Sequence, residues 1–403
     1  MKNYLFINNS LSGNGGAKVI LNLANILISR GHSVSILLDR TDNIEYNINS
    51  KIIMYRRMVS GIDLFDTNNI SESNKKTINY KHVGISSKLK NVIKKIIFLL
   101  NFPRLLNDVN NYRKFIKKNR FDVIVNNNIY IGIDRVFFEK KLSNNYYVNF
   151  HNSPLDVFKR ADFFHVLPLE KIFYKANILS VSKGITEELS QSFKFCLNSE
   201  RVIYNPFSIQ ELREASDDMS NIFDGEYIIM VSTLSKRKRV DRAIECFSQV
   251  CLQFPNLNFI ILGKGELEHE LKLLAEKLGV EDRVIFLGFS DNPYKYIARS
   301  KCLILTSDSE GLPTVIIEAL ILGVPVISTD CPTGPSEILD VFGDECLVSI
   351  QKSESKIIDE MSKKICSLLR HEYGKEYIIN KAGLERFSSD RIAHEWEMLG
   401  YKI

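Results

Sequence analysis

Short apolar runs alternate along this chain with longer segments in which apolar positions recur at helical spacing. The short runs are rich in Val, Ile, Leu and Tyr, which predicts buried strands, and the segments between them predict helices. This alternation is typical of parallel sheets covered by helices. The predicted strands span 4–9, 33–39, 121–127, 146–150, 178–182 and 201–205 in a first series, and 227–232, 258–263, 283–288, 301–307, 324–329 and 346–350 in a second.

The two series predict two doubly wound α/β domains. The polar stretch SIQELREASDDMSNIFDGE after Pro206 has no sustained apolar face and predicts a linker or small excursion. We therefore expect an N-terminal domain at 1–205 and a C-terminal domain at 206–387. Residues 388–403 predict a last helix that packs back across the junction. Because doubly wound sheets bind ligands beyond the carboxyl ends of their strands, a cleft between the domains is the expected binding site.

The composition fits this picture. With 403 residues and 45% hydrophobic content, the chain can bury two cores. The N-terminus has only four consecutive apolar residues before Asn8, and later apolar runs stop short of a membrane-spanning length. We therefore expect a cytoplasmic protein. The seven cysteines include no C-x-x-C pair, which favours reduced, packed thiols over disulfides or a zinc site.

Positive charge is concentrated in residues 81–120, whose eleven Lys or Arg and one acid give a formal +10 in a chain of net +5. The sequence SSKLKNVIKKIIFLLNFPR predicts a helix with one apolar face and one basic face. Such a helix can lie on an anionic membrane, each cation contributing about 1 kcal/mol. An ordinary surface helix is the alternative, and the lack of an aromatic stacking platform argues against nucleic acid. The expected membrane or acceptor contacts are Lys88, Lys90, Lys94 and Lys95.

Two loops at strand ends have the composition of phosphate sites. Gly13, Gly15 and Gly16 separate the first strand from a predicted helix, and such glycines let a phosphate approach a helix N-terminus. Asp39 lies near where a dinucleotide-binding protein has its ribose-binding acid, but Lys18 stands where the third glycine of G-x-G-x-x-G belongs, so a tight turn is the alternative.

The second of these loops carries four consecutive cations before a helix expected near Val240. They are Lys236, Arg237, Lys238 and Arg239. Cations at a helix N-terminus oppose the helix dipole, so an anion or water should lie beside them. A solvated charge run is the ordinary alternative.

A third loop, EGLPTVIIE at 310–318, places two glutamates eight positions apart around the start of a predicted helix. Pro313 suits the first helical position, and the free N–H groups there can bind an anion. At about 1.5 Å per residue the glutamates span up to roughly 12 Å, the reach from a sugar across a diphosphate to a ribose. Carboxylates bind hydroxyl donors strongly. The alternative for Glu318 is a capping or ion-paired role.

The segments EGLPTVIIEALILGVPVISTDCPTGPSEIL and LGKGELEHELKLLAEKLGVEDRVIFLGF resemble the retaining glycosyltransferases of the GT-B fold that carry Glu-x7-Glu, known as glycosyltransferase family 4 or glycosyl transferases group 1. GGAKVILNLANILISRGHSVSIL resembles the family's first loop and helix, and VNFHNSP, SVSKGITEEL and VIYNPF fit its middle landmarks. The resemblance covers nearly the whole chain. It implies two Rossmann-like domains facing an interdomain cleft, the first binding acceptor and the second nucleotide-sugar donor.

The resemblance also implies residue roles. Glu310 would hold the transferred sugar, Lys238 would neutralise the donor diphosphate and Glu318 would hold the ribose. His151 would sit beneath the reacting sugar, although a lone histidine at a strand end is more often structural. We expect Glu310, His151 and Lys238 to be catalytic. The other implied donor-binding residues are Gly15, Gly16, Gly288, Phe289, Ser290, Gly311, Leu312, Pro313 and Thr314.

One position departs from the family. Members usually have an arginine five residues before the lysine, in a Gly-Arg-Leu run, where this chain has Ser232-Thr233-Leu234. A lysine is a point charge and does not replace the planar arginine fork. Our hypothesis is that Lys236 or Arg237 compensates.

The resemblance and the motifs imply a particular reaction. The absence of a convincing D-x-D predicts no metal and no cofactor, with leaving-group charge met by Lys238 and helix N–H groups. DCPTGPSEIL resembles enzymes that use UDP-linked galactose or N-acetylhexosamine, which favours a UDP-sugar donor. With the basic helix, this predicts a lipid-linked saccharide acceptor, bacterial surface polysaccharide as the product, and a peripheral position on the inner face of the cell membrane.

Two alternatives stay open, and a third fits the sequence least well. A nucleotide-sugar epimerase shares this fold and needs no acceptor, but its acid and histidine pattern is not evident. An NAD-dependent oxidoreductase would explain the first loop and Asp39, but leaves Glu-x7-Glu without a role. A non-catalytic carbohydrate or lipid binder would not need two phosphate sites.

Overall fold

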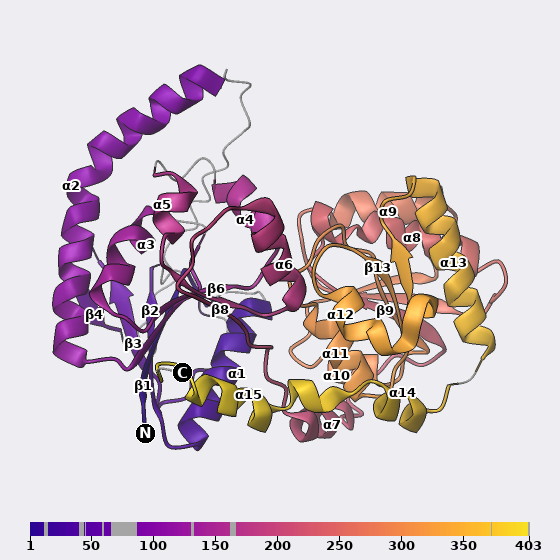
Figure 1. Cartoon of the computed structure of the whole chain (residues 1–403). Coiled ribbons are helices and arrows are strands. Elements are labelled where there is room, and N and C mark those ends of the chain that lie inside the picture. Colours follow the sequence, from indigo (N-terminus) through magenta and orange to yellow (C-terminus); the bar gives the residue numbers. More distant parts are fainter. Residues whose placement is uncertain are drawn as a thin grey trace. The chain divides into compact units, whose positions relative to one another are not determined.

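The structure is a computed structural model that describes residues 1–11, 15–39, 44, 46–58, 60–65, 87–129, 133–161, 167–371 and 373–401, without the side chains of 87–99 and 160–161. The chain divides into two compact units (Figure 1). Unit 1 comprises Met1–Val181, Ile185–Pro206 and Ile392–Ile403, and unit 2 comprises Ser182–Gly184 and Phe207–Arg391.

Unit 1 is built on an eight-stranded sheet of order β4-β3-β2-β1-β5-β6-β7-β8, parallel except for the β3–β4 pair. Its strands are β1 (Asn3–Asn8), β2 (Ser33–Leu38), β3 (Ile53–Arg57), β4 (Ile62–Leu64), β5 (Val123–Asn126), β6 (Tyr146–Phe150), β7 (Asn177–Ser180) and β8 (Ser199–Val202). The central strands are buried almost throughout, as parallel strands covered on both faces should be.

Helices from distant parts of the chain cover this sheet. They are α1 (Gly15–Ser29), α2 (Ser87–Asn119), α3 (Asp134–Glu139), the short η2 (Lys140–Leu142), α4 (Pro154–Ala161), α5 (Leu169–Phe173), α6 (Lys183–Ser192) and the last helix α15 (Ser389–Glu397). Trp396 of α15 is 3% exposed and packs edge-on against Phe6 of β1, with ring centroids 5.6 Å apart. Helix α15 therefore packs into the same core as β1.

Unit 2 has a six-stranded, fully parallel sheet of order β11-β10-β9-β12-β13-β14. Its strands are β9 (Tyr227–Val231), β10 (Asn258–Leu262), β11 (Val284–Gly288), β12 (Cys302–Leu305), β13 (Val326–Asp330) and β14 (Leu347–Ser349). Its helices are α7 (Ile209–Ser216), η3 (Lys236–Lys238), α8 (Val240–Val250), α9 (Glu268–Lys277), α10 (Tyr294–Ile297), α11 (Thr314–Ile321), α12 (Pro335–Leu339), η4 (Asp340–Cys346), α13 (Glu354–Arg370), α14 (Lys375–Lys381) and η5 (Leu384–Phe387). Figure 1 shows α8, α9 and α13 together on one side of this sheet.

The predicted strands are all present, with ends that differ by a few residues, and the helix predicted near Val240 is α8. Two strands were not predicted: β3 contains two arginines, and β4 has only three partly or fully exposed residues, so neither shows an apolar run. The prediction of a linker after Pro206 was wrong in part, because α7 forms there. It buries only Leu212 and Ser216, too few positions to give a periodic signal.

The predicted basic helix is part of α2, which passes the β4 edge of unit 1 (Figure 1). Its described C-terminal half packs on the unit through buried Val109, Tyr112 and Phe115. The side chains of Lys88, Lys90, Lys94 and Lys95 lie outside those described, so a membrane role stays a prediction. Among the helices as described, none combines the length and apolar character needed to cross a membrane.

In each sheet the strand order reverses at one point, which we call the switch point. It lies between β1 and β5 in unit 1 and between β9 and β12 in unit 2. Loops leaving neighbouring strands go to opposite faces there, which opens a crevice at the carboxyl ends of the strands. The loops predicted to carry chemistry follow β1, β9 and β12. The fold thus places them at the two crevices.

Candidate functional site

In unit 2, an acid from one switch-point loop meets two cations from the other. Glu310 follows β12 and is 5% exposed. Its Oε1 accepts hydrogen bonds from Lys238 Nζ at 2.6 Å and Ser307 Oγ at 2.6 Å. Its Oε2 lies 3.1 Å from a terminal guanidinium nitrogen of Arg237. The two predicted site residues Glu310 and Lys238 are therefore in direct contact.

These contacts decide the charge of the Glu310 carboxyl. Burial opposes its ionisation, but Lys238 and Arg237 outweigh burial and hold its pKa below the usual value. The group is therefore a carboxylate at neutral pH. The side chains of Arg237 and Lys238 keep 26% and 17% of their surface exposed, so each cation can contact a further anion.

The four consecutive cations at 236–239 differ in their contacts. Arg237 and Lys238 face Glu310, whereas Lys236 is exposed. Arg239 turns away through a left-handed backbone (φ 50°) and pairs with Asp241 and Glu354 at 2.9 and 2.8 Å. The anion expected beside the run is thus a protein carboxylate for three of its four members.

The segment after Glu310 forms a buried turn that opens into α11. Gly311, Leu312 and Pro313 are buried, and Pro313 lies one residue before the helix, not in its first position as predicted. Thr314 and Glu318 are partly exposed and four residues apart, so they share one helical face.

A second turn, at Thr333 and Gly334, packs against the segment from Glu310 to Pro313. Thr333 and Gly334 both have positive φ, 64° and 95°, and Thr333 Oγ1 donates to the Glu310 carbonyl. A Cβ at Gly334 would lie 2.6 Å from Pro313 Cδ and 2.7 Å from the Gly311 carbonyl oxygen. Only glycine fits between the two turns. The motif DCPTGPSEIL therefore helps fix the position of the Glu310 loop.

The glycine pair after β10, Gly263 and Gly265, had no predicted role. A Cβ at Gly263 would lie 1.8 Å from the Ser232 carbonyl oxygen, and one at Gly265 would lie 2.2 Å from that of Leu234. The two backbones also bond directly, Leu234 N donating to the Lys264 carbonyl at 3.1 Å. The G-x-G spacing after a strand was the available signal.

Gly263 also contacts Gly288, one of the residues predicted to lie beside the nucleotide base. Gly263 N donates to the Gly288 carbonyl at 2.7 Å, and Gly288 has φ 72°. Phe289 beyond it is 51% exposed, and Ser290 is half-buried. An exposed aromatic ring on a fixed turn can contact a planar base.

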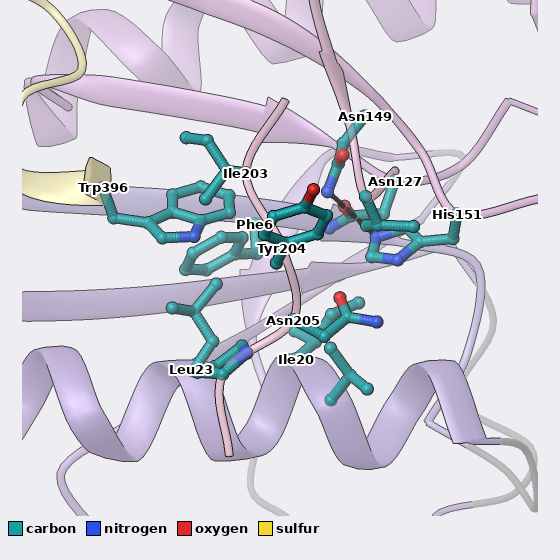
Figure 2. Close-up of a pocket in the computed structure, with 13 residues that line it drawn as sticks. Phe6, Ile20, Leu23, Asn127, Asn149, His151, Ile203, Tyr204, Asn205 and Trp396 are labelled. Carbon is teal, nitrogen blue, oxygen red and sulfur yellow. Dashed lines mark hydrogen bonds between the residues drawn. The ribbon is translucent and has the colours of Figure 1, made fainter. Parts of the chain in front are cut away.

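In unit 1, His151 lies at the end of β6 within a group of amides (Figure 2). Its Nε2 is 3.0 Å from Asn127 Oδ1 and 2.9 Å from Asn149 Nδ2, and Asn127 Oδ1 also accepts from Asn149 Nδ2 at 3.0 Å. In the tautomer with hydrogen on Nε2, the ring donates to Asn127 Oδ1 and Nδ1 is an acceptor. Burial lowers the His151 pKa to about 4, so the ring is neutral at pH 7.

His151, Asn127 and Asn149 line one end of a small pocket whose other end is formed by Phe6 and Trp396 (Figure 2). Gly15 and Gly16 begin α1 and are exposed. A Cβ on Gly15 would meet nothing within 4 Å, so packing among the described residues does not require glycine there. Gly13 lies outside the described residues.

Asp39 is the residue that an oxidoreductase would need for a ribose. Its Oδ1 accepts from Arg57 Nε at 2.8 Å, and its Oδ2 accepts from Arg135 and Asn128 at 2.5 and 2.6 Å. Burial opposes ionisation, but Arg135 and Arg57 hold the Asp39 pKa below its usual value. Both oxygens are already committed to buried protein donors, which leaves Asp39 a structural role.

Among the described residues, no group of three or more His, Cys, Asp or Glu side chains could hold a metal ion. The polar groups available to a ligand in the switch-point loops of unit 2 are instead cations, one carboxylate and backbone N–H groups.

Two doubly wound domains joined in one chain match solved structures of the GT-B fold, and this is the fold of the protein. A crystal structure of a Staphylococcus aureus TarM variant with UDP, α-GlcNAc-glycerol and fondaparinux matches 100% of both chains, with a TM-score of 0.68 at 14% identity. At that identity the match shows the fold alone.

Sequence comparison finds a family match within the second unit. Residues 213–382, which include Arg237, Lys238 and Glu310, match the family described as Glycosyl transferases group 1. An uncharacterized glycosyltransferase of Methanocaldococcus jannaschii is 36% identical over 52% of this chain and 53% of its own length. A Campylobacter jejuni N-acetylgalactosamine-N,N'-diacetylbacillosaminyl-diphospho-undecaprenol 4-alpha-N-acetylgalactosaminyltransferase is 29% identical over 56% and 60%. The chain thus spans a little over half the length of these relatives.

Proposed function

We propose that this protein is a retaining glycosyltransferase that moves a hexose or N-acetylhexosamine from a UDP-sugar to a lipid-linked saccharide in the assembly of a bacterial surface polysaccharide. One observation carries the proposal: Arg237 and Lys238 meet the buried carboxylate of Glu310 at the switch point of unit 2. That arrangement lies inside the region that matches the glycosyltransferase family.

The proposed donor site uses both signs of charge. Arg237 and Lys238 neutralise the diphosphate as it leaves, together with the N–H groups at the start of α11. Glu310 accepts hydrogen bonds from hydroxyls of the transferred sugar, and Glu318 accepts from those of the ribose. Gly288, Phe289 and Ser290 lie by the uracil base. The chain's own cations meet the leaving-group charge, so the reaction as proposed needs no metal.

Arg237 takes over the role of the arginine that this chain replaces with Thr233. Its guanidinium already touches Glu310, whereas Lys236 is exposed, so the structure favours Arg237 over Lys236 as the compensating cation. A guanidinium can bind a phosphate with two parallel hydrogen bonds, which an ammonium cannot.

His151 acts as a neutral hydrogen-bond acceptor beneath the reacting sugar. Its lowered pKa keeps the ring uncharged at pH 7, and Asn127 positions it through Nε2. The proposed partner of Nδ1 is a hydroxyl of the acceptor or of the transferred sugar. Gly15 and Gly16 are exposed at the start of α1, where the proposed diphosphate lies, and no described atom lies within 4 Å of a Cβ added at Gly15.

The acceptor proposal rests on two observations. The Campylobacter relative acts, by its name, on a saccharide linked to diphospho-undecaprenol. The basic segment that begins α2 suits an anionic membrane where such lipids lie. We therefore propose a peripheral position on the inner face of the cell membrane.

Turnover tests the proposal directly. The purified protein is incubated with UDP-galactose, UDP-GlcNAc or UDP-GalNAc and an undecaprenyl-diphosphate-linked saccharide, and the product linkage is read by proton NMR. An α-linked product from an α-linked donor supports the proposal. A β-linked product would reject retention, and an altered UDP-sugar formed without acceptor would identify an epimerase.

A further inference from the structure

A second cavity, of about 360 Å³, lies in unit 2 away from the donor loops. It is bordered by α11, α13 and α14 and by Val326 and Ile327, the first two residues of β13. The donor loops leave the carboxyl ends of β9 and β12, so this cavity lies at the opposite edge of the same parallel sheet. Its volume is within the range of small-molecule sites.

The floor of the cavity is apolar. Leu320, Val326 and Ile327 are each 1% exposed and Ile378 is 3% exposed. These side chains offer no hydrogen-bond partner, so they suit an aliphatic or aromatic body better than a sugar.

The rim of the cavity carries exposed aromatic rings. Tyr373 and Tyr377 stack with centroids 5.9 Å apart and an interplanar angle of 21°, and they are 40% and 48% exposed. Exposed stacked rings beside an apolar floor extend the surface that a ligand body can cover.

The charged groups at the cavity favour an anion. Lys364 and Lys381 line it with one acid, Glu345. The ammonium of Lys381 lies 3.0 Å from the Tyr377 hydroxyl and 5.3 Å from the centroids of Phe342 and Tyr377. It is thus held at the boundary between the aromatic rim and solvent.

We propose that this cavity binds an amphipathic anion, an acyl or aryl body that ends in one phosphate or carboxylate. The body fills the apolar floor and stacks against Tyr373 and Tyr377, and the anionic group pairs with Lys381. This site is separate from the proposed donor site and does not depend on it.

The test uses the full chain and titrates octyl phosphate below its micelle concentration by isothermal calorimetry. Octyl phosphate should bind and 1-octanol should bind at least about tenfold more weakly, because octanol lacks the charge-assisted bond to Lys381. Lys381→Gln should weaken octyl phosphate by about tenfold. Lys363→Gln is the matched control, since Lys363 is an exposed lysine of α13 that pairs with Asp359 outside the cavity.

A cavity-blocking variant keeps the proposal falsifiable. Ser367 lines the cavity at an exposed position of α13, so Ser367→Trp should fill it without disturbing the core, and binding should be lost. Ser355→Trp, exposed on the same helix but outside the cavity, should bind as the wild type does. No binding of octyl phosphate at millimolar concentration, or equal binding by Ser367→Trp, would overturn the proposal.

Vesicles identify the source of the ligand. Phosphatidic acid vesicles present the same phosphate and acyl chain in a bilayer. Binding to octyl phosphate alone supports the proposal with a soluble amphiphile as the ligand. Because the basic start of α2 is also proposed to bind an anionic membrane, vesicle binding is measured in a protein with Lys88, Lys90, Lys94 and Lys95 changed to Gln. In that background, vesicle binding that Ser367→Trp abolishes supports the proposal with a membrane lipid, whereas vesicle binding that this variant retains counts against the cavity as the site.

Discussion

The Glu310 carboxylate is held by two cations that each keep an exposed side. Lys238 and Arg237 compensate a buried charge, and breaking such a pair leaves the other charge uncompensated. A diphosphate that approaches these cations can therefore bind without displacing Glu310. At the residue scale, the ion-paired group is a structural unit and, in the proposed site, also binds the donor diphosphate.

Arg237→Ala should lower kcat/KM for the UDP-sugar by about tenfold to a hundredfold. The variant loses a charge-assisted hydrogen bond to the diphosphate, and such bonds contribute about 1.5–3 kcal/mol. Lys236→Ala, one position away and exposed, should stay within about twofold of the wild type. Steady-state kinetics on both variants, with melting temperatures to confirm folding, checks this. Equal kinetics for the two variants would reject the role of Arg237.

His151 makes stability depend on pH in a defined window. Its folded pKa is about 4 and its ordinary value is 6.5, so between these values the unfolded chain binds more protons than the folded one. Stability should therefore fall as pH drops from 6.5 towards 4. His151→Gln should reduce this loss. Urea midpoints of both proteins at pH 7 and pH 5 measure it, and an unchanged pH dependence in the variant would contradict the lowered pKa of His151.

Much of the site could be predicted from sequence because the fold does most of the positioning. Glu310 and Lys238 follow neighbouring strands, and the carboxyl ends of parallel strands meet at one edge. That Arg237, not Lys236, reaches Glu310 depends on the turn geometry of η3, which charge alone does not encode. The amide group around His151 combines residues from two strands and loops, so no local motif announced it.

At the scale of elements, strands were easy to predict where both faces are buried. The parallel strands appear in sequence as continuous apolar runs, whereas β3, β4 and α7 bury too few residues to do so. The Gly263–Gly265 contact with Ser232–Leu234 is between backbones, so side-chain patterns carry little information about it. Contacts between the backbones of two turns are therefore hard to predict from sequence.

The turn at Gly334 provides a test of such support. Gly334→Ala adds a Cβ that clashes with Pro313 and Gly311 and forces alanine to positive φ. The backbone penalty is about 1–2 kcal/mol, and the overpacking adds about 1–3 kcal/mol. Gly383→Ala is the control, since Gly383 has φ 59° but no atom within 4 Å of an added Cβ. Melting temperature should fall more in Gly334→Ala, and UDP-sugar protection should weaken only there; equal falls would contradict the supporting role.

At the scale of the whole molecule, each unit has a complete doubly wound sheet and its own switch point. Unit 1 recruits the last residues of the chain, through Trp396, into the core built by β1. Unit 2 carries the ion-paired Glu310 and the start of α11 within the region that matches the glycosyltransferase family. We therefore propose that unit 2 binds the UDP-sugar and that Glu318 binds its ribose.

Thermal melting of the full chain with UDP-, GDP- and dTDP-sugars and NAD(H), repeated on Glu318→Ala, tests this assignment most directly. A ligand that binds only the folded state raises the melting temperature. We predict a rise with a UDP-sugar in the wild type that disappears in Glu318→Ala, while the variant without ligand melts as a folded protein. A rise in melting temperature with NAD(H) alone would contradict this assignment. So would the absence of a rise with every nucleotide tested at millimolar concentration.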